Sequence, residues 1–209
     1  MRVLEDLSEK IPLTTVRRFP FESSPGERGA STLQLASLLE QFHRAARDAN
    51  ELVLGRAASD LTSRLHPDAW SATECLDHLA RTTLSFLPAI SRAIATAPKL
   101  TTNRPLRTGT IALLLIRNLE PPYRLRYKVI PQLVPWETDF DAAMSNFAKS
   151  QSQLSEAVQS TDGFAIDKVK VQCPVYARIS YNVYGAFRML AAHQRRHLWQ
   201  MRQIFTALD

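Results

Sequence analysis

Apolar residues recur every three or four positions over long parts of the chain, which is the spacing that places them on one face of a helix. In residues 31–57 they form one such stripe: Leu35, Leu38, Leu39, Phe42, Ala46, Ala49 and Val53. Ser31 stands just before the stripe, and a serine side chain can accept a hydrogen bond from a free N–H at a helix start. The pattern predicts a first helix with Ser31 as its N-cap.

A second helix is predicted over residues 70–95. It begins with Ser71 and Glu74, whose S-x-x-E spacing lets each side chain accept a hydrogen bond from the backbone N–H of the other residue. Its apolar side continues through Leu79, Phe86 and Ile90. Pro88 lies inside the pattern, and because proline has no N–H to donate, we expect a kink there.

Two further helices are predicted in the second half of the chain, after a long connection. Residues 98–135 contain six prolines around one apolar run, so we expect a crossover that holds a single short helix. Residues 136–160 carry a helical stripe that starts near Thr138 or Asp139, and a last helix should run from about residue 179 to residue 208. Four long helices with a crossover between the second and the third predict an all-α fold, a four-helix bundle.

The first thirty residues show no sustained helical pattern. They are interrupted by Pro12, Pro20, Pro25, Gly26 and Gly29. We therefore expect residues 1–30 to form an N-terminal extension that buries little surface. The chain has 209 residues, of which 45% are hydrophobic, and residues 31–209 are predicted to form one well-packed domain.

Composition excludes several classes of protein. No apolar run reaches the roughly 18 residues of a membrane span, and the start of the chain has acidic residues where a signal peptide would be apolar. We therefore expect a cytoplasmic protein. Cys75 and Cys173 form no CxxC pair, which excludes a zinc ribbon. The 26 basic and 20 acidic residues are spread along the chain, so the clustered basic face of a nucleic-acid groove is not expected.

Two histidines four residues apart lie in the predicted last helix. On a helical wheel, His193 and His197 fall on the apolar side of this helix. That side also contains Ala186, Leu190, Met201, Ile204 and Leu208. We expect it to face the bundle interior, where side chains one helical turn apart can share one metal ion. The opposite side carries Arg188, Arg195 and Arg202, which we expect to be solvated.

A metal site in a bundle needs at least one more ligand from a facing helix. Of the other three histidines, His66 lies in a predicted loop and His43 lies at the margin of the first helical stripe, so we expect both to be solvated. His78 lies in the second predicted helix and is the candidate third ligand. The alternative that the spacing leaves open is a set of core or boundary histidines without a metal.

The stretches WSATECLDHLA (residues 70–80) and HQRRHLWQ (residues 193–200) resemble the DinB-like superfamily of bacterial four-helix bundles. In that family, one histidine of the second helix and an HxxxH pair of the fourth helix bind a divalent metal ion. The resemblance implies that His78, His193 and His197 are the ligands, with zinc or nickel as the expected ion. It covers the predicted bundle but not the N-terminal extension.

Three neutral imidazoles leave coordination positions open, and an open divalent ion can acidify a bound water or polarise a substrate oxygen or thiol. The family includes thiol-dependent S-transferases and isomerases, and proteins described as metal-dependent hydrolases. The resemblance therefore implies a metal-dependent hydrolase or a low-molecular-weight-thiol S-transferase that acts on a small-molecule substrate. The alternative is a non-catalytic helical interaction protein with a structural metal, in which four ligands would close the ion.

Three residues near His78 have two interpretations each. Glu74 belongs to the capping box, the role that its spacing favours, and is also the candidate catalytic base. Arg81 is either solvated or the candidate substrate anchor. Cys75 is expected to be a small buried residue rather than a thiolate ligand. Bundles often bury helix faces in dimers, so a homodimer is the candidate assembly, although no self-complementary patch stands out.

Overall fold

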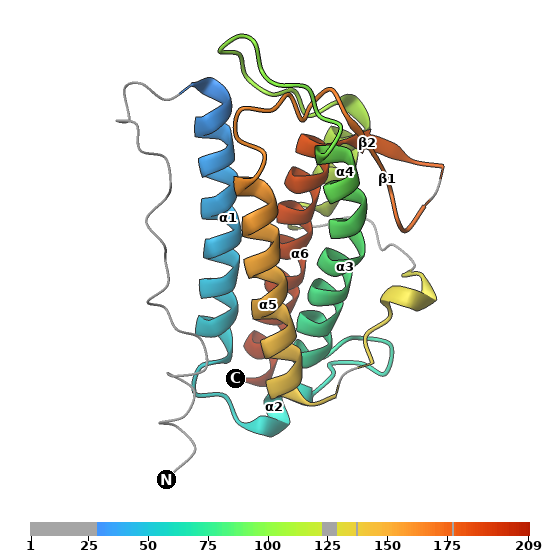
Figure 1. Cartoon of the computed structure of the whole chain (residues 1–209). Coiled ribbons are helices and arrows are strands. Elements are labelled where there is room, and N and C mark those ends of the chain that lie inside the picture. Colours follow the sequence, from blue (N-terminus) through green and yellow to red (C-terminus); the bar gives the residue numbers. More distant parts are fainter. Residues whose placement is uncertain (1–28, 123–128, 137, 177) are drawn as a thin grey trace.

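Four long helices lie side by side and form a bundle (Figure 1). The computed structural model describes residues 29–122, 129–136, 138–176 and 178–209, and most of the predicted N-terminal extension lies outside these ranges. The long helices are α1 (Ala30–Val53), α3 (Ala72–Ile94), α5 (Phe140–Gln159) and α6 (Val183–Leu208). The prediction of an all-α four-helix bundle is confirmed.

The packing contacts show how the four helices are arranged. Helix α3 packs against α5 and α6, and α1 packs against the same two helices. The connection from α3 to α5 contains α4 (Thr110–Leu119), which packs on α6, and a 3-10 turn, η1 (Pro131–Leu133), which packs on α3. The long crossover with one short helix is thus confirmed, and η1 is an addition to it. Within the described ranges, no helix combines the length and the hydropathy that crossing a membrane requires.

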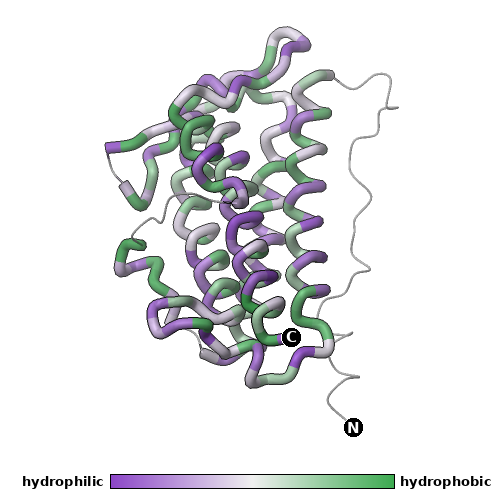
Figure 2. Tube along the Cα trace, turned by 180° about the vertical axis from the view of Figure 1, so that it is seen from behind, coloured by the Kyte–Doolittle hydropathy of each residue, from purple (hydrophilic) through white to green (hydrophobic). Residues whose placement is uncertain are grey.

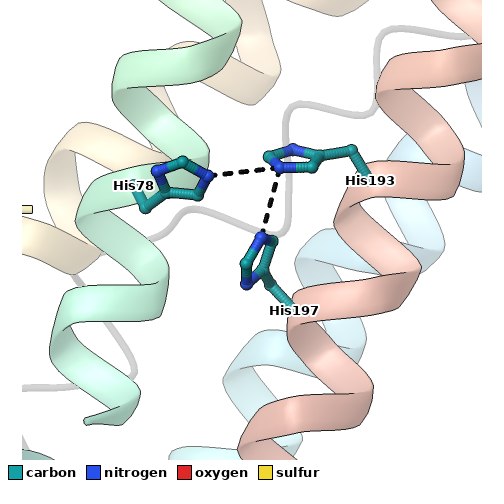
Figure 3. A group of neighbouring side chains, drawn as sticks. All are labelled: His78, His193 and His197. Atoms are coloured by element: carbon teal, nitrogen blue, oxygen red, sulfur yellow. Dashed lines mark hydrogen bonds between the residues drawn. The ribbon is translucent and has the colours of Figure 1, made fainter. Parts of the chain in front are cut away.

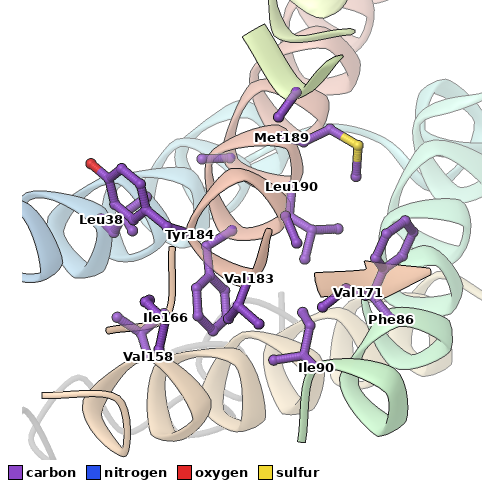
Figure 4. Close-up of a cluster of buried hydrophobic side chains, with 14 of the residues drawn as sticks. Leu38, Phe86, Ile90, Val158, Ile166, Val171, Val183, Tyr184, Met189 and Leu190 are labelled. Atoms are coloured by element: carbon purple, nitrogen blue, oxygen red, sulfur yellow. The ribbon is translucent and has the colours of Figure 1, made fainter. Parts of the chain in front are cut away.

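Hydrophobic and hydrophilic residues alternate around the long helices (Figure 2), and the apolar faces form two core clusters. The first cluster, part of which is drawn in Figure 4, includes Leu38, Phe86, Ile90, Val158 and Leu190. The second includes Leu76, Leu79, Phe147, Leu198 and Met201. Along the helices, the buried polar residues Thr83, Gln151 and Gln194 lie between the two clusters. The apolar core is therefore divided by a polar layer at mid-height of the bundle.

Two of the predicted helix starts are confirmed by hydrogen bonds to the first free N–H groups. The Glu74 N–H donates to Ser71 Oγ (3.2 Å), and the Ser71 N–H donates to Glu74 Oε2 (2.8 Å), which completes the capping box. At the start of α5, the Ala142 N–H donates to Asp139 Oδ1 (2.8 Å). Replacing such a cap by alanine typically costs about 1 kcal/mol, so these two residues help to place α3 and α5.

The prediction that Ser31 is the N-cap of the first helix is wrong. Helix α1 begins at Ala30, and Ser31 is buried in its first turn. The Ala30 N–H donates instead to the side-chain oxygen of Asn103 (2.7 Å), which lies in the crossover. The group that satisfies this helix start therefore comes from a distant part of the chain.

The last helix starts later than predicted. Residues Ser180–Asn182 form strand β2, which pairs antiparallel with β1 (Lys170–Gln172), so α6 begins at Val183. Asn182 caps it by accepting a hydrogen bond from the Gly185 N–H (2.7 Å). This small sheet and the short helix α2 (Ala58–Thr62) were not predicted. Helix α3 contains Pro88, as predicted, and continues to Ile94, and the kink expected at Pro88 stays a prediction.

Gly185 lies where α6 approaches the start of α4 closely. A Cβ atom at this position would lie 2.7 Å from the Cβ of Ala112 and 2.7 Å from the carbonyl oxygen of Thr108. We expect Gly185→Ala to lower the free energy of unfolding by about 1–3 kcal/mol, because the two helices must move apart. Thr206→Ala, at an exposed position of α6, should change it by less than about 0.5 kcal/mol. Urea denaturation checks both, and equal stability of the two variants would contradict the close approach.

Candidate metal centre

Three histidines converge between α3 and α6. His78 projects from α3 toward His193 and His197, which project from successive turns of α6 (Figure 3). The Nε2 atom of His193 lies 3.2 Å from Nε2 of His78 and 3.2 Å from Nε2 of His197. One ligand atom from each residue can be chosen so that all three lie within 4.8 Å of one another. The structure therefore brings together the three histidines that the sequence analysis named as candidate ligands.

These separations suit coordination of a single ion. Two nitrogen ligands that each lie about 2.1 Å from an ion, at the tetrahedral angle, are separated by about 3.4 Å. The two observed Nε2 separations of 3.2 Å are close to this value. Among the described residues, no cysteine, aspartate or glutamate joins the cluster. The three histidines could therefore hold a divalent ion and would leave coordination positions open.

The ring of His78 is held in one tautomer by the backbone of η1. Its Nδ1 atom lies 2.7 Å from the carbonyl oxygen of Leu133. Because a carbonyl oxygen only accepts, Nδ1 carries the hydrogen and Nε2 presents a lone pair to His193. A carbonyl acceptor on the outer nitrogen is the arrangement that metal-binding histidines usually have.

His197 is oriented by its own helix and by an aromatic neighbour. Its Nδ1 atom lies 3.2 Å from Oε1 of Gln200, which again leaves Nε2 free to face His193. The ring of Trp70 stacks on His197 with the centroids 5.6 Å apart, and its centroid lies 4.6 Å from that of His78. Trp70 therefore packs against two of the three rings and limits their rotation.

The three Nε2 atoms cannot all be satisfied by one another. His78 and His197 both turn a lone pair toward His193, whose single Nε2 hydrogen can be donated to only one of them. The second lone pair then has no hydrogen to accept from the other two imidazoles, and the Thr82 hydroxyl, 3.5 Å from Nε2 of His78, is at the limit of hydrogen-bond distance. A cation at the common point removes this conflict, so the donor set fits a metal ion.

Burial keeps all three imidazoles neutral. It lowers the pKa of His78 to about 4, against the opposing effects of the Leu133 carbonyl and the Asp77 carboxylate. Burial also lowers the pKa of His193 and of His197 well below the ordinary value. The positive charge of Arg196 lowers all three further. Since only neutral imidazole binds a metal, the site is prepared for an ion at neutral pH.

The histidines lie at the wall of a large cleft. Its volume is about 1420 Å³, and most of its wall is apolar, with Phe86 of α3, Leu119 of α4, Met189 of α6 and Ile130 beside η1. Arg196 also lines the cleft and is buried. Sequence reasoning missed Arg196, although its position three residues after His193 places it one turn away on the same side of α6.

The two weaker site candidates have other contacts. The Glu74 carboxylate caps α3 and also accepts two hydrogen bonds from the Arg64 guanidinium. Burial raises the pKa of Glu74, but the hydrogen bonds from Arg64 and Ser71 and the Arg64 charge outweigh this and leave it below its usual value. Arg81 donates to the carbonyl oxygen of Gln132 (2.6 Å). Neither Glu74 nor Arg81 is among the described residues that line the large cleft.

The remaining histidines and Cys75 do not join the histidine cluster. His66 is exposed, as expected, whereas His43 is half-buried rather than solvated. Cys75 is buried among apolar residues, and burial raises the pKa of its thiol, which supports its interpretation as a small core residue. Leu208, predicted on the buried face of α6, is exposed at the helix end.

Of the three arginines predicted to be solvated, Arg202 is exposed as expected and the other two are partly buried; all three also connect α6 to its neighbours. Arg188 hydrogen-bonds the Thr108 hydroxyl, and Arg202 pairs with Asp48 of α1 (2.8 Å). Arg195 is half-buried and bridges two elements. It bonds the Glu120 carboxylate after α4 and the Gln41 side chain of α1 (2.8 Å). The helical wheel correctly placed these residues on the side of α6 that faces away from the bundle interior. Neighbouring elements cover part of that side.

A comparison with known protein families supports the same set of histidines. The DinB superfamily model matches residues 41–201, a range that runs from α1 to α6 and contains His78, His193 and His197. No curated protein and no solved structure matches the chain significantly.

The lowered pKa of His78 predicts how stability depends on pH. Above pH 6.5 the residue is neutral in both the folded and the unfolded chain. Between pH 6.5 and about 4 only the unfolded chain binds the proton, so the free energy of unfolding falls as the pH falls. His78 alone accounts for up to about 3 kcal/mol of this loss. Denaturation of the metal-free protein over this pH range should show it.

Two variants test the assignment of this pH dependence. His78→Gln should flatten the decline in stability between pH 6.5 and 4, because glutamine does not titrate. His66→Gln, at an exposed position, should leave the wild-type slope unchanged. An equal slope in wild type and His78→Gln would contradict the buried neutral state of His78.

Proposed function

The chain belongs to the DinB superfamily, and we propose that it is a metal-dependent enzyme whose ion is held by His78, His193 and His197. Zinc and nickel are the ions proposed, since both accept imidazole nitrogen. The observation that carries the proposal is the meeting of three Nε2 atoms at the wall of a cleft of about 1420 Å³. An ion at this wall can reach a substrate, whereas an ion inside the apolar core could not.

The ligand set supports a catalytic ion over a structural one. Structural zinc sites are closed by four protein ligands, whereas catalytic sites have three and keep a position for water or substrate. The described residues offer three histidines and no further cysteine or carboxylate in the cluster. Two apolar core clusters stabilise the bundle, so we expect the fold not to depend on an ion.

Thiol transfer is the reaction that the site supports best. When bound, the ion would supply Lewis-acid chemistry that lowers the pKa of a thiol or of water. An ordinary thiol has a pKa of about 8.5. A bound cation lowers that pKa enough to keep the thiol deprotonated at neutral pH without a protein base. No carboxylate of the described residues lies in the histidine cluster to serve as such a base, and Glu74 is held by its cap and by Arg64. Hydrolysis is therefore the second candidate.

The cleft suggests the kind of substrate. Its predominantly apolar wall, which includes Phe86, Leu119 and Met189, suits the hydrophobic part of a small electrophile. Arg196 brings a positive charge to the same wall and would attract an anionic group of the thiol or of the electrophile. In the proposed reaction a sulfur–carbon bond forms, the leaving group departs with the bonding electrons, and the thiol proton passes to solvent.

The test combines metal analysis with an assay of thiol transfer. Purified protein should contain close to one zinc or nickel per chain and should catalyse attack of a cellular thiol on an aryl chloride, with release of chloride. His193→Ala should lower metal affinity by about tenfold or more and abolish turnover, because one of three ligands is lost. Arg202→Ala, on the outer side of the same helix, is the matched control and should retain metal and activity.

The outcomes separate the candidates. Full metal content without activity toward any of several thiols, together with cleavage of an ester or amide, would favour the hydrolase. Full metal content and activity in His193→Ala would contradict the proposed site.

Removal of the ion distinguishes an enzyme from a protein with a structural metal. A chelator should abolish turnover and leave the helical circular dichroism unchanged at neutral pH, because the apolar core of the bundle is complete without the ion. Adding zinc or nickel back should restore turnover. Unfolding of the chelated protein at neutral pH would instead support a structural metal.

A further inference from the structure

The acceptor that orients His78 does not belong to the bundle. The carbonyl oxygen of Leu133 lies in η1, 55 residues along the chain from His78, and accepts from His78 Nδ1 at 2.7 Å. The tautomer of a ligand in the core therefore depends on where a turn of the crossover lies. The contacts that keep this turn on α3 therefore also fix the orientation of the His78 ring.

Two residues of α3 that flank His78 hold the turn from both sides. The Arg81 guanidinium donates through Nη2 to the carbonyl oxygen of Gln132 (2.6 Å), the residue just before Leu133. The Asp77 carboxylate accepts from the backbone N–H of Trp136 (3.0 Å), three residues after Leu133. Asp77 and Arg81 are one helical turn apart, so they lie on the same side of α3, with His78 between them in the sequence.

A third contact also keeps the turn in place. The Arg81 guanidinium carbon lies 4.1 Å from the centroid of the Trp136 ring, which is a cation–π contact. Arg81 thus binds the turn both before and after Leu133, and the Leu133 side chain is buried beneath it. These contacts occupy the side chain that the sequence suggested as a substrate anchor.

We propose that Arg81 and Asp77 are positioning residues for His78, which act by fixing the Leu133 carbonyl. The proposal rests on the proposed function where it concerns metal affinity, but its effect on the tautomer of His78 does not require an ion. With the turn in place, Nδ1 carries the hydrogen and Nε2 is available to a metal. If the turn moves away, Nδ1 loses its acceptor and the ring can rotate or exchange its hydrogen between the two nitrogens.

The first test measures metal binding. In titrations with cobalt(II), the dissociation constant of Arg81→Ala should rise about tenfold, the lower end of the loss that follows removal of a ligand's supporting contact. The visible absorption of the bound cobalt should also change, because His78 is less well oriented. Arg92→Ala, at an exposed position of the same helix, is the matched control and should bind as wild type does. An equal loss in Arg92→Ala would show general damage to α3 and would overturn the proposal.

The second test uses a pair of variants at Asp77. Asp77→Ala removes the acceptor for the Trp136 N–H and should weaken cobalt binding in the same way as Arg81→Ala. Asp77→Asn keeps an oxygen acceptor and should restore most of the affinity. If Asp77→Asn binds as weakly as Asp77→Ala, the role of Asp77 lies in its charge near His78 and not in holding the turn.

The third test requires no metal. NMR of isotopically labelled histidine nitrogens at neutral pH should show His78 of the metal-free wild type with its hydrogen on Nδ1, and a mixture of tautomers in Arg81→Ala. Unchanged tautomer and unchanged cobalt affinity in Arg81→Ala would overturn the proposal while leaving the metal site intact. A wild-type chain that binds none of cobalt, zinc and nickel would overturn the proposed function, and the tautomer measurement would still decide the role of Arg81.

Discussion

The hydrogen bond from His78 to the Leu133 carbonyl is the interaction on which the site depends. Burial lowers the pKa of His78, so its imidazole is neutral at neutral pH, and a neutral imidazole has one nitrogen that donates and one that accepts. The carbonyl takes the donor, at 2.7 Å, and so turns the accepting nitrogen toward His193. With His197 oriented in the same sense by Gln200, three Nε2 atoms meet at one point, where a cation satisfies them better than they can satisfy one another.

The bundle accommodates these histidines at the wall of a cleft, beside the apolar core. Two clusters of leucine, phenylalanine and isoleucine side chains supply the burial that stabilises the fold, and the polar layer between them includes Thr83, Gln151 and Gln194. Along α6, His193 lies next to this layer, whereas His78 lies beside Leu76 and Leu79 of the second cluster on α3. All three histidines line the cleft, so a ligand can reach them without entering the apolar core.

The crossover contributes both a hydrogen-bond acceptor for His78 and part of the wall of the candidate site. It supplies the Leu133 carbonyl, and its residues Ile130 and Leu133 also line the cleft. Asp77 and Arg81 of α3 fasten it next to His78. One segment of the crossover therefore orients His78 and also forms part of the cleft wall.

The sequence by itself determined what depends on neighbours within one or two helical turns. Apolar spacing predicted the four long helices, the S-x-x-E pattern predicted the capping box at Ser71, and the i,i+4 spacing of His193 and His197 placed both on one face, because helix geometry is local. With the family resemblance, it also selected His78. Tertiary structure decided what depends on distant partners. Asn103 rather than Ser31 satisfies the start of α1, β1 delays the start of α6, and Leu133 orients His78. Local spacing carries no information about such contacts, because only the folded chain determines which distant backbone groups come within hydrogen-bonding distance.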